Sequence, residues 1–263
     1  MGIRIWYQSM APLAGLSGYV DALQRHAKQA CPEGVEVVFN GASEEPYRGY
    51  MPTDILKYPY VKQVLQTEAI EFCRQAERDG FDAVVLGSFS EPFLAEIRSL
   101  LEIPVISMPE SVLLTACSLA EQFALVALTP ASARRVRNLV RRHGLESRAC
   151  AIQSLTKPVN ENDLNAAFAA PKAIVADFTA AAERAVNAGA DVVIPAEGVL
   201  NEVLYENGVR NVMGATVMDC VGVALLYAEL QINLKRRLGI GVGRRWTYAK
   251  PPLELLERIK HTR

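Results

Sequence analysis

Histidine is scarce in this chain: its 263 residues include three, and its five cysteines form no Cys-x-x-Cys pair. Structural metal sites need closely spaced Cys or His ligands, so no metal site is indicated. The sequence also lacks a Gly-x-Gly-x-x-Gly after its first expected strand and a phosphate-binding Gly-x-x-x-x-Gly-Lys-Ser/Thr loop. A protein without a cofactor is therefore the simplest interpretation.

Charge of one sign and long apolar runs are also missing. Lys+Arg number 28 and Asp+Glu 29, a net charge of −1, so we expect no nucleic-acid partner. No apolar run approaches the roughly 18 residues of a membrane-spanning helix, so we expect no membrane partner. The N-terminus, MGIRIWYQSM, has no basic-then-apolar leader, and the odd cysteine count favours a reduced, cytoplasmic location.

Short β-branched runs alternate with longer helical patterns along the chain. Strands are expected at Ile3–Gln8, Val35–Asn40, Asp82–Gly87, Pro104–Ser107, Phe123–Thr129, Ala149–Gln153, Asp191–Pro195 and Val212–Ala215. Helices are expected at Gly18–Ala30, Val61–Asp79, Glu91–Leu101, Ser111–Ala120, Ala131–His143, Ala173–Ala188, Leu200–Asn207 and Asp219–Leu234. Residues 46–60 and 156–171 read as irregular connections. This alternation predicts an α/β fold with parallel sheets covered by helices.

Two stretches of the sequence resemble each other. Ala76–Ser88 aligns without gaps on Ala185–Glu197, an offset of 109 residues, and the same offset places Glu110 on Asp219. Any two helix–Gly–strand units share such features, which leaves coincidence open. A duplicated half predicts two similar Rossmann-like lobes about a pseudo-two-fold axis, with a cleft at the strands' carboxyl ends. We place lobe one at about 1–120 with 220–263, and lobe two at about 121–219.

Ser88 and Glu197 each follow equivalent strands and precede expected helix N-termini. Ser88 also suits a helix cap, and Glu197 suits a first-turn acid. Facing each other across the cleft, they become candidate catalytic residues. Backbone N–H groups beyond them would hold a carboxylate or oxyanion. The residues concerned are Phe89, Ser90, Gly198 and Val199, and the Phe89 ring could also wall off the pocket or simply fill the core.

Few other residues offer themselves as a base. His26 and His143 lie in expected surface helices and His261 in the tail, so all three read as solvated and a Ser-His-Asp triad is not indicated. A serine hydroxyl does not ionise usefully, whereas partial burial would raise the pKa of the Glu197 carboxyl towards neutrality. The cysteines read as small core residues: Cys31, Cys73, Cys117, Cys150 and Cys220.

Further residues can be placed around this pair. Tyr7, Gln8 and Ser9 end the first strand and could bind a substrate carboxylate or imide, or form a turn; Thr129 ends another strand. Glu110 and Asp219 suit capping of the helices that follow them. Residues 47–50, which include Tyr47, Arg48 and Tyr50, could cover the pocket or pack against another subunit. The arginine-rich stretch 133–144 reads as a solvated helix face or a subunit interface.

Several segments, in order, resemble the Asp/Glu/hydantoin racemase superfamily, nearest its hydantoin-racemase branch. Val84–Ser111 is similar to the family's first catalytic segment, a strand ending in a catalytic Cys followed by an aromatic residue, an acid and Pro. Gly189–Leu200 is similar to the second catalytic segment, and the tail Arg244–Pro252 to the tail of that branch. The resemblance implies two Rossmann-like lobes, no cofactor and a homo-oligomer.

The chain departs from the family at both catalytic cysteines, where Ser88 and Glu197 stand instead. This disfavours a symmetric two-base racemase. We expect an enzyme acting on a small carboxylate, amide or hydantoin-like substrate, by proton chemistry of isomerase or lyase type next to a carbonyl. Glu197 would be the general acid/base and Ser88 its opposing hydrogen-bonding or nucleophilic partner. Hydrolysis of an amide or cyclic amide by the same pair, and binding of a small carboxylate without chemistry, remain alternatives.

Overall fold

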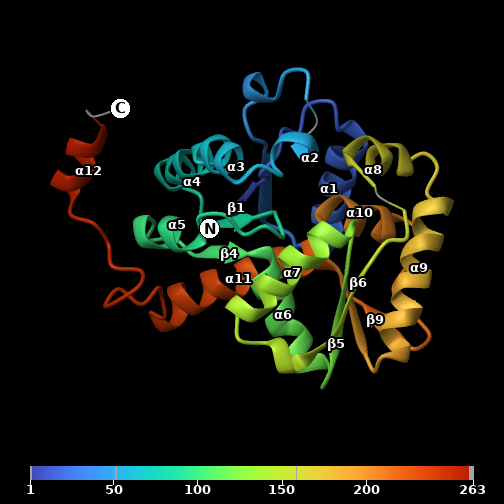
Figure 1. The fold of residues 1–263 in the computed structure, drawn as a ribbon. Coiled ribbons are helices and arrows are strands. Elements are labelled where there is room, and N and C mark those ends of the chain that lie inside the picture. Colours follow the sequence, from blue (N-terminus) through green and yellow to red (C-terminus); the bar gives the residue numbers. More distant parts are fainter. Residues whose placement is uncertain (1, 51, 158, 261–263) are drawn as a thin grey trace.

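The computed structural model describes residues 2–50, 52–157 and 159–260 and contains two β-sheets covered by helices (Figure 1). Sheet A has the order β2-β1-β3-β4 and is parallel throughout. Sheet B has the order β6-β5-β7-β9-β8 and is parallel except for β8, which pairs antiparallel with β9. The strands are β1 (Ile3–Gln8), β2 (Val35–Asn40), β3 (Ala83–Leu86), β4 (Val105–Ser107), β5 (Phe123–Ala127), β6 (Ala149–Ser154), β7 (Val192–Pro195), β8 (Asn211–Val212) and β9 (Ala215–Val217).

Helices connect the strands in the order that the sequence predicts. They are α1 (Ser17–Ala30), α2 (Pro52–Ile55), α3 (Pro59–Gln66), α4 (Glu68–Arg78), α5 (Leu94–Leu100), α6 (Met108–Leu119), α7 (Pro130–Arg142), α8 (Glu161–Ala167), α9 (Lys172–Asn187), α10 (Gly198–Glu206), α11 (Cys220–Leu238) and α12 (Leu253–Lys260), with 3-10 turns η1 (Glu45–Tyr47) and η2 (Glu146–Arg148). The predicted α/β fold with parallel sheets is confirmed.

Several boundaries differ from the prediction for local reasons. The helix expected over 61–79 is two helices, α3 and α4, which meet at Thr67. The helix expected from Glu91 begins only at Leu94, because Glu91 and Phe93 adopt positive φ values of 46° and 56°. The connection expected over 156–171 contains α8, which a reciprocal Asn160–Asp163 capping box starts. The strand expected over 212–215 is the β8–β9 hairpin, and the tail carries α12.

The strand registers relate the two sheets. Val84 of β3 lies opposite Val105 of β4, and Val193 of β7 lies opposite Val217 of β9. Because Val84 and Val193 match in the sequence repeat, β4 corresponds to β9 and their ends correspond as well. In the same way β1 and β2 correspond to β5 and β6, since each central strand pairs with strands two and three of its own sheet.

The expected match of Glu110 with Asp219 is therefore wrong. The register instead pairs Ser107 with Asp219, and both residues are helix N-caps. The Ser107 hydroxyl accepts a hydrogen bond from the Glu110 backbone N–H, and the Asp219 carboxylate accepts one from Gly222. Capping by Asp219 is confirmed, but the Glu110 carboxylate caps nothing: it pairs with Arg98. The offset of the repeat changes between the third and fourth strands, so an ungapped alignment cannot carry through both.

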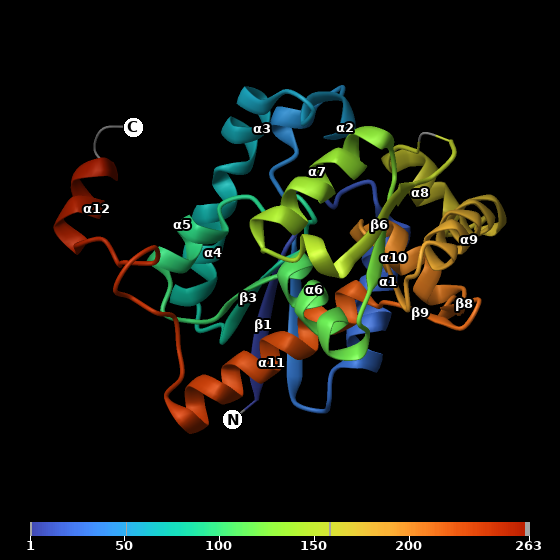
Figure 2. The ribbon, with the colours of Figure 1, turned by 60° about the horizontal axis from the view of Figure 1, so that its bottom comes forward.

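Helices hold the lobes together. Helix α11, which follows sheet B, contacts β3 and β4 of sheet A and packs beside α6 (Figure 2). Helix α1, which follows β1 of sheet A, packs on α10 and α11. One apolar cluster accordingly runs from Ile5 of sheet A to Val193 of sheet B. The C-terminal segment leaves this body as an extended stretch and places α12 apart from it (Figure 1). None of the described helices is long and apolar enough to cross a membrane.

Candidate functional site

A pair of buried tyrosines marks the point where the third strands of both lobes end. Tyr7 comes from β1 and Tyr19 from α1, and their hydroxyl oxygens lie 3.5 Å apart. A Cβ atom on Gly87, which follows β3, would lie 2.2 Å from the Tyr7 ring, so only glycine fits there. A Cβ atom on Gly198, which follows β7 and Glu197, would lie 3.1 Å from the Tyr19 hydroxyl and 3.8 Å from that of Tyr7. Both strand ends therefore border one tyrosine pair.

Ser88 and Glu197 adjoin these glycines, and both are half-buried. The Ser88 hydroxyl lies 3.0 Å from that of Ser90 and accepts a hydrogen bond of 3.2 Å from the Ser90 backbone N–H. Glu197 is the N-cap of α10, and its Oε2 accepts the Leu200 N–H at 2.6 Å. This contact fixes the direction of the carboxylate, and a carboxylate can accept further hydrogen bonds.

The backbone around the two residues is not symmetric. Gly198 and Val199 form the first turn of α10, where N–H groups point out of the helix as expected. The expected helix N-terminus after Ser88 is absent, because α5 starts six residues later. Phe89 and Ser90 therefore lie in a turn, with Phe89 partly buried against the core. An N–H-lined anion site at a helix start is available only on the Glu197 side.

The tyrosine hydroxyls are proton donors in this setting. Burial raises the pKa of Tyr7 well above its usual value, and the nearby carboxylates of Glu202 and Glu197 add to the effect. Burial likewise raises the pKa of Tyr19. Both phenols thus stay protonated across the physiological range and can donate hydrogen bonds to a developing oxyanion.

The side chains of the predicted binding residues Gln8, Ser9 and Thr129 form hydrogen bonds within the protein. The Gln8 amide oxygen accepts from the Trp6 indole and from Asn40, each at 3.0 Å, and its NH₂ donates to the Ser9 carbonyl. The Ser9 hydroxyl donates to the Ala11 carbonyl at 3.0 Å in a turn. Thr129 caps α7 in a reciprocal capping box with Ser132. Of these strand-end residues, the structure brings only Tyr7 to the strand ends of both lobes.

Residues 47–50 divide between core and surface. Tyr47 is buried, whereas the Tyr50 side chain is 63% exposed and Arg48 pairs with Glu45 at the surface. A cover or subunit contact by this segment stays a prediction. In α7 all five arginines are exposed, while Val136 and its neighbours on the opposite face are buried, as a solvated helix face requires.

His26 is not solvated as expected: it is 1% exposed and bridges the lobes. From α1 its Nδ1 lies 2.8 Å from Glu202 of α10, and its Nε2 lies 2.8 Å from the Asp219 cap of α11. Its ring also stacks on Tyr205, with centroids 3.5 Å apart. Asn201 donates to both carboxylates. We call His26, Asn201, Glu202 and Asp219 the His26 cluster.

The His26 cluster holds its charges by hydrogen bonding. Burial alone lowers the pKa of His26, but the hydrogen bonds to Asp219 and Glu202 outweigh it and raise the pKa to about 9. Burial raises the pKa of the Glu202 carboxyl, and His26 offsets only part of this. The Asp219 pKa is lowered because its bond to His26 overcomes burial. A cationic imidazole therefore lies between two acids, and one of them, Glu202, also raises the pKa of both tyrosines.

His143 is also not solvated as expected. Its Nε2 lies 3.0 Å and 3.1 Å from the two carboxylate oxygens of Glu91, whose side chain is 1% exposed. Ser107 donates to the same carboxylate, and Arg142 lies 3.7 Å from it. Burial opposes ionisation of Glu91, but His143 and Ser107 together lower its pKa. We call His143, Glu91, Ser107 and Arg142 the His143 cluster. The third histidine, His261, lies outside the described residues.

The five cysteines pack in or against the core of the described chain. Cys73 and Cys220 are buried, and the other three are half-buried in or against the core, as the sequence indicates. Cys220 adjoins the candidate site, with its thiol donating to the Pro195 carbonyl at 3.3 Å. Burial, together with Asp219 and Glu202, raises the pKa of this thiol well above its ordinary value. Cys220 is therefore a neutral packing residue at the site's edge.

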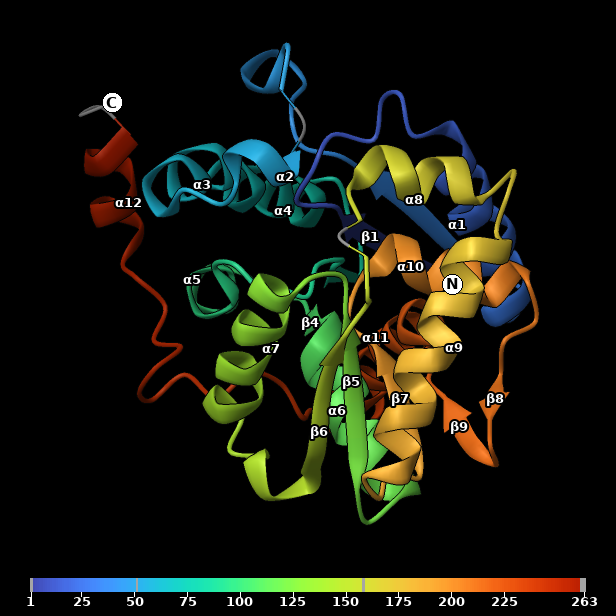
Figure 3. The same ribbon diagram turned by 45° about the vertical axis from the view of Figure 1, so that its right-hand side comes forward.

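A cavity of about 630 Å³ opens beside Ser88. Its lining residues come from α3, the β3–α5 loop and α7, among others, so both lobes line it. Figure 3 shows where these elements lie. Ser90 and Glu91 form part of its wall, and Ser90 is the hydrogen-bond partner of Ser88. A cavity of this size can hold a small-molecule ligand.

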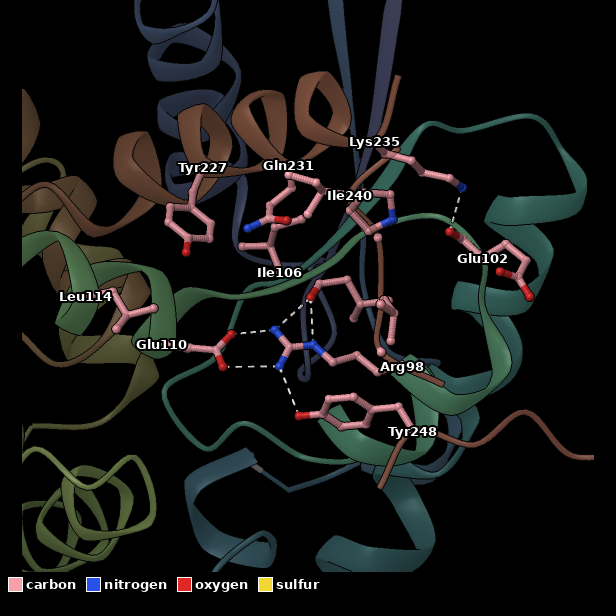
Figure 4. A pocket seen from close by; sticks show the side chains of 15 residues that line it. Arg98, Glu102, Ile106, Glu110, Leu114, Tyr227, Gln231, Lys235, Ile240 and Tyr248 are labelled. Carbon is pink, nitrogen blue, oxygen red and sulfur yellow. Dashed lines mark hydrogen bonds and ion pairs between the residues drawn. The ribbon is translucent and has the colours of Figure 1, made fainter. Parts of the chain in front are cut away.

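A smaller cavity of about 260 Å³ lies on the other side of Glu110, under the C-terminal tail (Figure 4). Arg98 at its centre is bound by Glu110, by the Val105 carbonyl and by Tyr248. Lys235 donates to the Glu102 carbonyl. Because its charged groups are satisfied within the protein, this cavity is a weaker ligand site than the one beside Ser88.

Comparison with known proteins places the chain in a family. The sequence profile of the Asp/Glu/hydantoin racemase family matches residues 10–228. The chain belongs to this family. It is also 25% identical over 218 residues to a hydantoin racemase from Pseudomonas sp. (strain NS671), covering 82% of this chain and 81% of that protein. The resemblance inferred from the motifs is confirmed, and family membership supports an enzyme of the isomerase class.

Solved structures share the two-lobed fold of this family member. An allantoin racemase from Klebsiella pneumoniae aligns with a TM-score of 0.75 at 18% identity, covering 95% of this chain and 94% of that chain. An allantoin racemase from Pseudomonas fluorescens aligns with a TM-score of 0.72 at 20% identity, covering 95% and 97%. An aspartate racemase homologue from Pyrococcus horikoshii aligns with a TM-score of 0.59 at 12% identity, covering 88% and 99%. At these identities the likeness establishes the fold.

Proposed function

We propose that this protein is a cofactor-independent isomerase that moves a proton at a carbon next to a carbonyl in a small hydantoin-like amide or carboxylate. Glu197 is the general acid/base, and Ser88 is its partner on the opposite face. The observation that carries the proposal is the meeting of the β3 and β7 ends at one tyrosine pair, where Gly87 and Gly198 leave room for both hydroxyls. Similarity to a hydantoin racemase supports the substrate class.

The proposed chemistry assigns one base to the site. The Glu197 carboxylate, oriented by the Leu200 N–H, removes the proton from the carbon. The resulting enolate oxygen accepts hydrogen bonds from a protonated tyrosine, Tyr7 or Tyr19, and from the first turn of α10. Glu197 then delivers the proton to another atom of the delocalised anion, which yields the isomer, whereas return to the same carbon from the same face yields isotope exchange alone. Ser88, held by Ser90, contacts the opposite face as a hydrogen-bonding group and not as a base.

Solvent isotope exchange tests this assignment. The protein is incubated in D₂O with a panel of 5-substituted hydantoins, allantoin and small α-substituted acids, and deuterium at the reacting carbon is followed by NMR. We expect exchange in the native protein, and a loss of at least about a hundredfold in Glu197→Gln, since a positioned general base contributes roughly 10²–10⁴ in rate. Ser88→Ala should slow exchange less. Exposed residues provide controls: Glu183→Gln and Ser118→Ala should exchange at the native rate.

The competing functions give different readouts in the same experiment. Incorporation of ¹⁸O from labelled water into a product acid, with no deuterium at carbon, would replace the proposal with hydrolysis. A bound ligand with neither label would replace it with binding alone. Native exchange rates in both Glu197→Gln and Ser88→Ala would remove these residues from the site.

A further inference from the structure

On the α3 wall of the large cavity beside Ser88 lies one cation, Lys62, that no described carboxylate pairs. Lys62 of α3 is half-buried in its wall, and Arg142 of α7 lines the same cavity. Burial, together with the nearby charges of Arg135 and Arg142, lowers the pKa of Lys62. Among the described residues no carboxylate comes within ion-pair distance of the Lys62 ammonium. Like charges gathered in this way destabilise the fold, and an anion would relieve the repulsion.

The acids around this cavity are mostly committed elsewhere. Glu91 is held by His143, Ser107 and Arg142. Glu110 is held by Arg98 across the wall that separates the two cavities. Glu96 lies at the exposed rim. The charge that faces the interior from α3 is therefore positive.

Gln66 adds an unsatisfied polar atom to the same wall. It is 3% exposed, and its NH₂ donates to the Met10 carbonyl at 3.3 Å, just beyond the end of β1. Its buried Oε1 has no hydrogen-bond partner in the described structure. A buried acceptor without a donor destabilises the protein, so a ligand N–H that reached this oxygen would be stabilising.

We propose that this cavity binds the substituent of the substrate, and that the substrate is an anionic amide. Lys62, with Arg142 beside it, binds a carboxylate, while Gln66 Oε1 accepts an amide N–H. The Ser90–Ser88 contact connects this cavity to the reacting end. The inference rests on the proposed function and narrows it: of the hydantoin-like compounds, those with a carboxylate on the ring substituent are preferred over neutral ones.

Calorimetric binding tests the inference independently of turnover. The probes are 5-(carboxymethyl)hydantoin and its neutral counterpart, 5-(carbamoylmethyl)hydantoin. We expect the native protein to bind the acid at least about tenfold more tightly, since a hydrogen bond between charged groups contributes roughly 1.5–3 kcal/mol. Lys62→Met should bring the two affinities together by weakening only the acid, and Gln66→Leu should weaken both. Lys172→Met, an exposed change on α9, should keep the native preference.

Stability separates a binding role from a structural one. Because Lys62 faces two arginines, Lys62→Met should keep or raise the melting temperature while it lowers acid affinity. Equal affinities of the native protein for the two probes would overturn the inference. So would a Lys62→Met variant that melts lower and loses both probes equally. If the acid is preferred but no compound exchanges deuterium, the anion site stands and the proposed function fails. If compounds exchange deuterium without any preference for the acid, the proposed function stands and the anion site fails.

Discussion

The His26 cluster and the His143 cluster occupy equivalent places in the two lobes. In each, a histidine from the helix after the central strand of one sheet reaches an acid that follows the third strand of the other sheet. Each cluster also contains an N-cap residue, at the end of β4 or just after β9. Asp219 is hydrogen-bonded to His26, and Ser107 donates to the Glu91 carboxylate. The pseudo-two-fold axis thus relates two histidine–carboxylate contacts between lobes.

The two clusters differ in charge. The His26 cluster places one imidazole between two acids, Glu202 and Asp219, and Glu202 Oε2 has no hydrogen-bond partner among the residues that the structure describes. The His143 cluster surrounds one acid, Glu91, with His143 and Arg142. Both lobes therefore have a histidine–carboxylate contact. Two acids meet one basic side chain in the His26 cluster, whereas two basic side chains meet one acid in the His143 cluster. Glu202 of the His26 cluster acts with the candidate base Glu197 on the pKa of Tyr7, whereas Arg142 and His143 line the cavity proposed for an anionic substituent.

Removal of His26 should have the largest effect on this comparison. His26→Leu leaves Glu202 and Asp219 buried without their cation, so the free energy of unfolding should fall by about 3–5 kcal/mol. Urea denaturation followed by circular dichroism measures this. Arg25→Leu, which removes an exposed pair with Glu206 from the same helix, should cost less than about 1 kcal/mol. Equal losses in the two variants would contradict the buried bridge.

The pH dependence of stability should identify His26 as the titrating group. The pKa of His26 is about 9 in the folded protein and roughly 6.5 when unfolded. The stability that protonated His26 gives the fold is therefore fully present below pH 6.5 and is lost as pH rises through 9. The stability advantage of the native protein over His26→Leu should shrink by up to about 3 kcal/mol across that window. An advantage that stays constant from pH 6.5 to pH 9 would refute the assignment.

The two glycines at the tyrosine pair should respond unequally to alanine. Gly87→Ala forces a methyl group into the buried Tyr7 ring, so stability should fall by roughly 1–3 kcal/mol and deuterium exchange should be lost. Gly198→Ala meets only the Tyr19 hydroxyl at 3.1 Å and should cost less. Thermal melts and the exchange assay compare the variants. A Gly198→Ala variant more damaged than Gly87→Ala would contradict the geometry.

Loss of the other histidine should have the smallest effect. In His143→Gln the Glu91 carboxylate keeps Ser107 and Arg142, so we expect a loss of about 1 kcal/mol. Because these contacts lower the Glu91 pKa, the stability they give is present above the unfolded value near 4.3 and lost as pH falls below it. Urea titrations at pH 7 and pH 3.5 should therefore differ more for the native protein than for His143→Gln.

The sequence predicted the fold well because its signals are local. Runs such as Val35–Asn40 are rich in β-branched residues and end at turns, so the expected strand and the observed β2 have the same bounds. The repeat correctly related β3 to β7, but its match of Glu110 with Asp219 was wrong. The segment that connects β3 to β4 differs in length from the one that connects β7 to β9.

The histidine contacts were missed because they join distant residues: His26 and Glu202 are 176 positions apart. A signal was nevertheless present. Tyr19, Leu23 and His26 recur at helical spacing, with Ala22 between them and Ala27 after them, which marks His26 on the buried stripe of α1. His143 offered less, since it is the C-cap of α7, just beyond the helix. Gly87 could be recognised as a strand-end glycine, but only the fold shows the tyrosine ring that requires it.

The proposed use of Ser88 and Glu197 in place of two catalytic cysteines has a consequence for durability. The thiolate that makes a cysteine base effective is also the group that peroxides, heavy metals and alkylating reagents attack. Here the strand ends carry Ser88 and Glu197, and the Cys220 thiol, whose pKa Glu197 helps to raise, is buried and neutral. With the proposed acid/base chemistry on a carboxylate, the enzyme would keep its activity under oxidative stress that inactivates thiol-dependent enzymes.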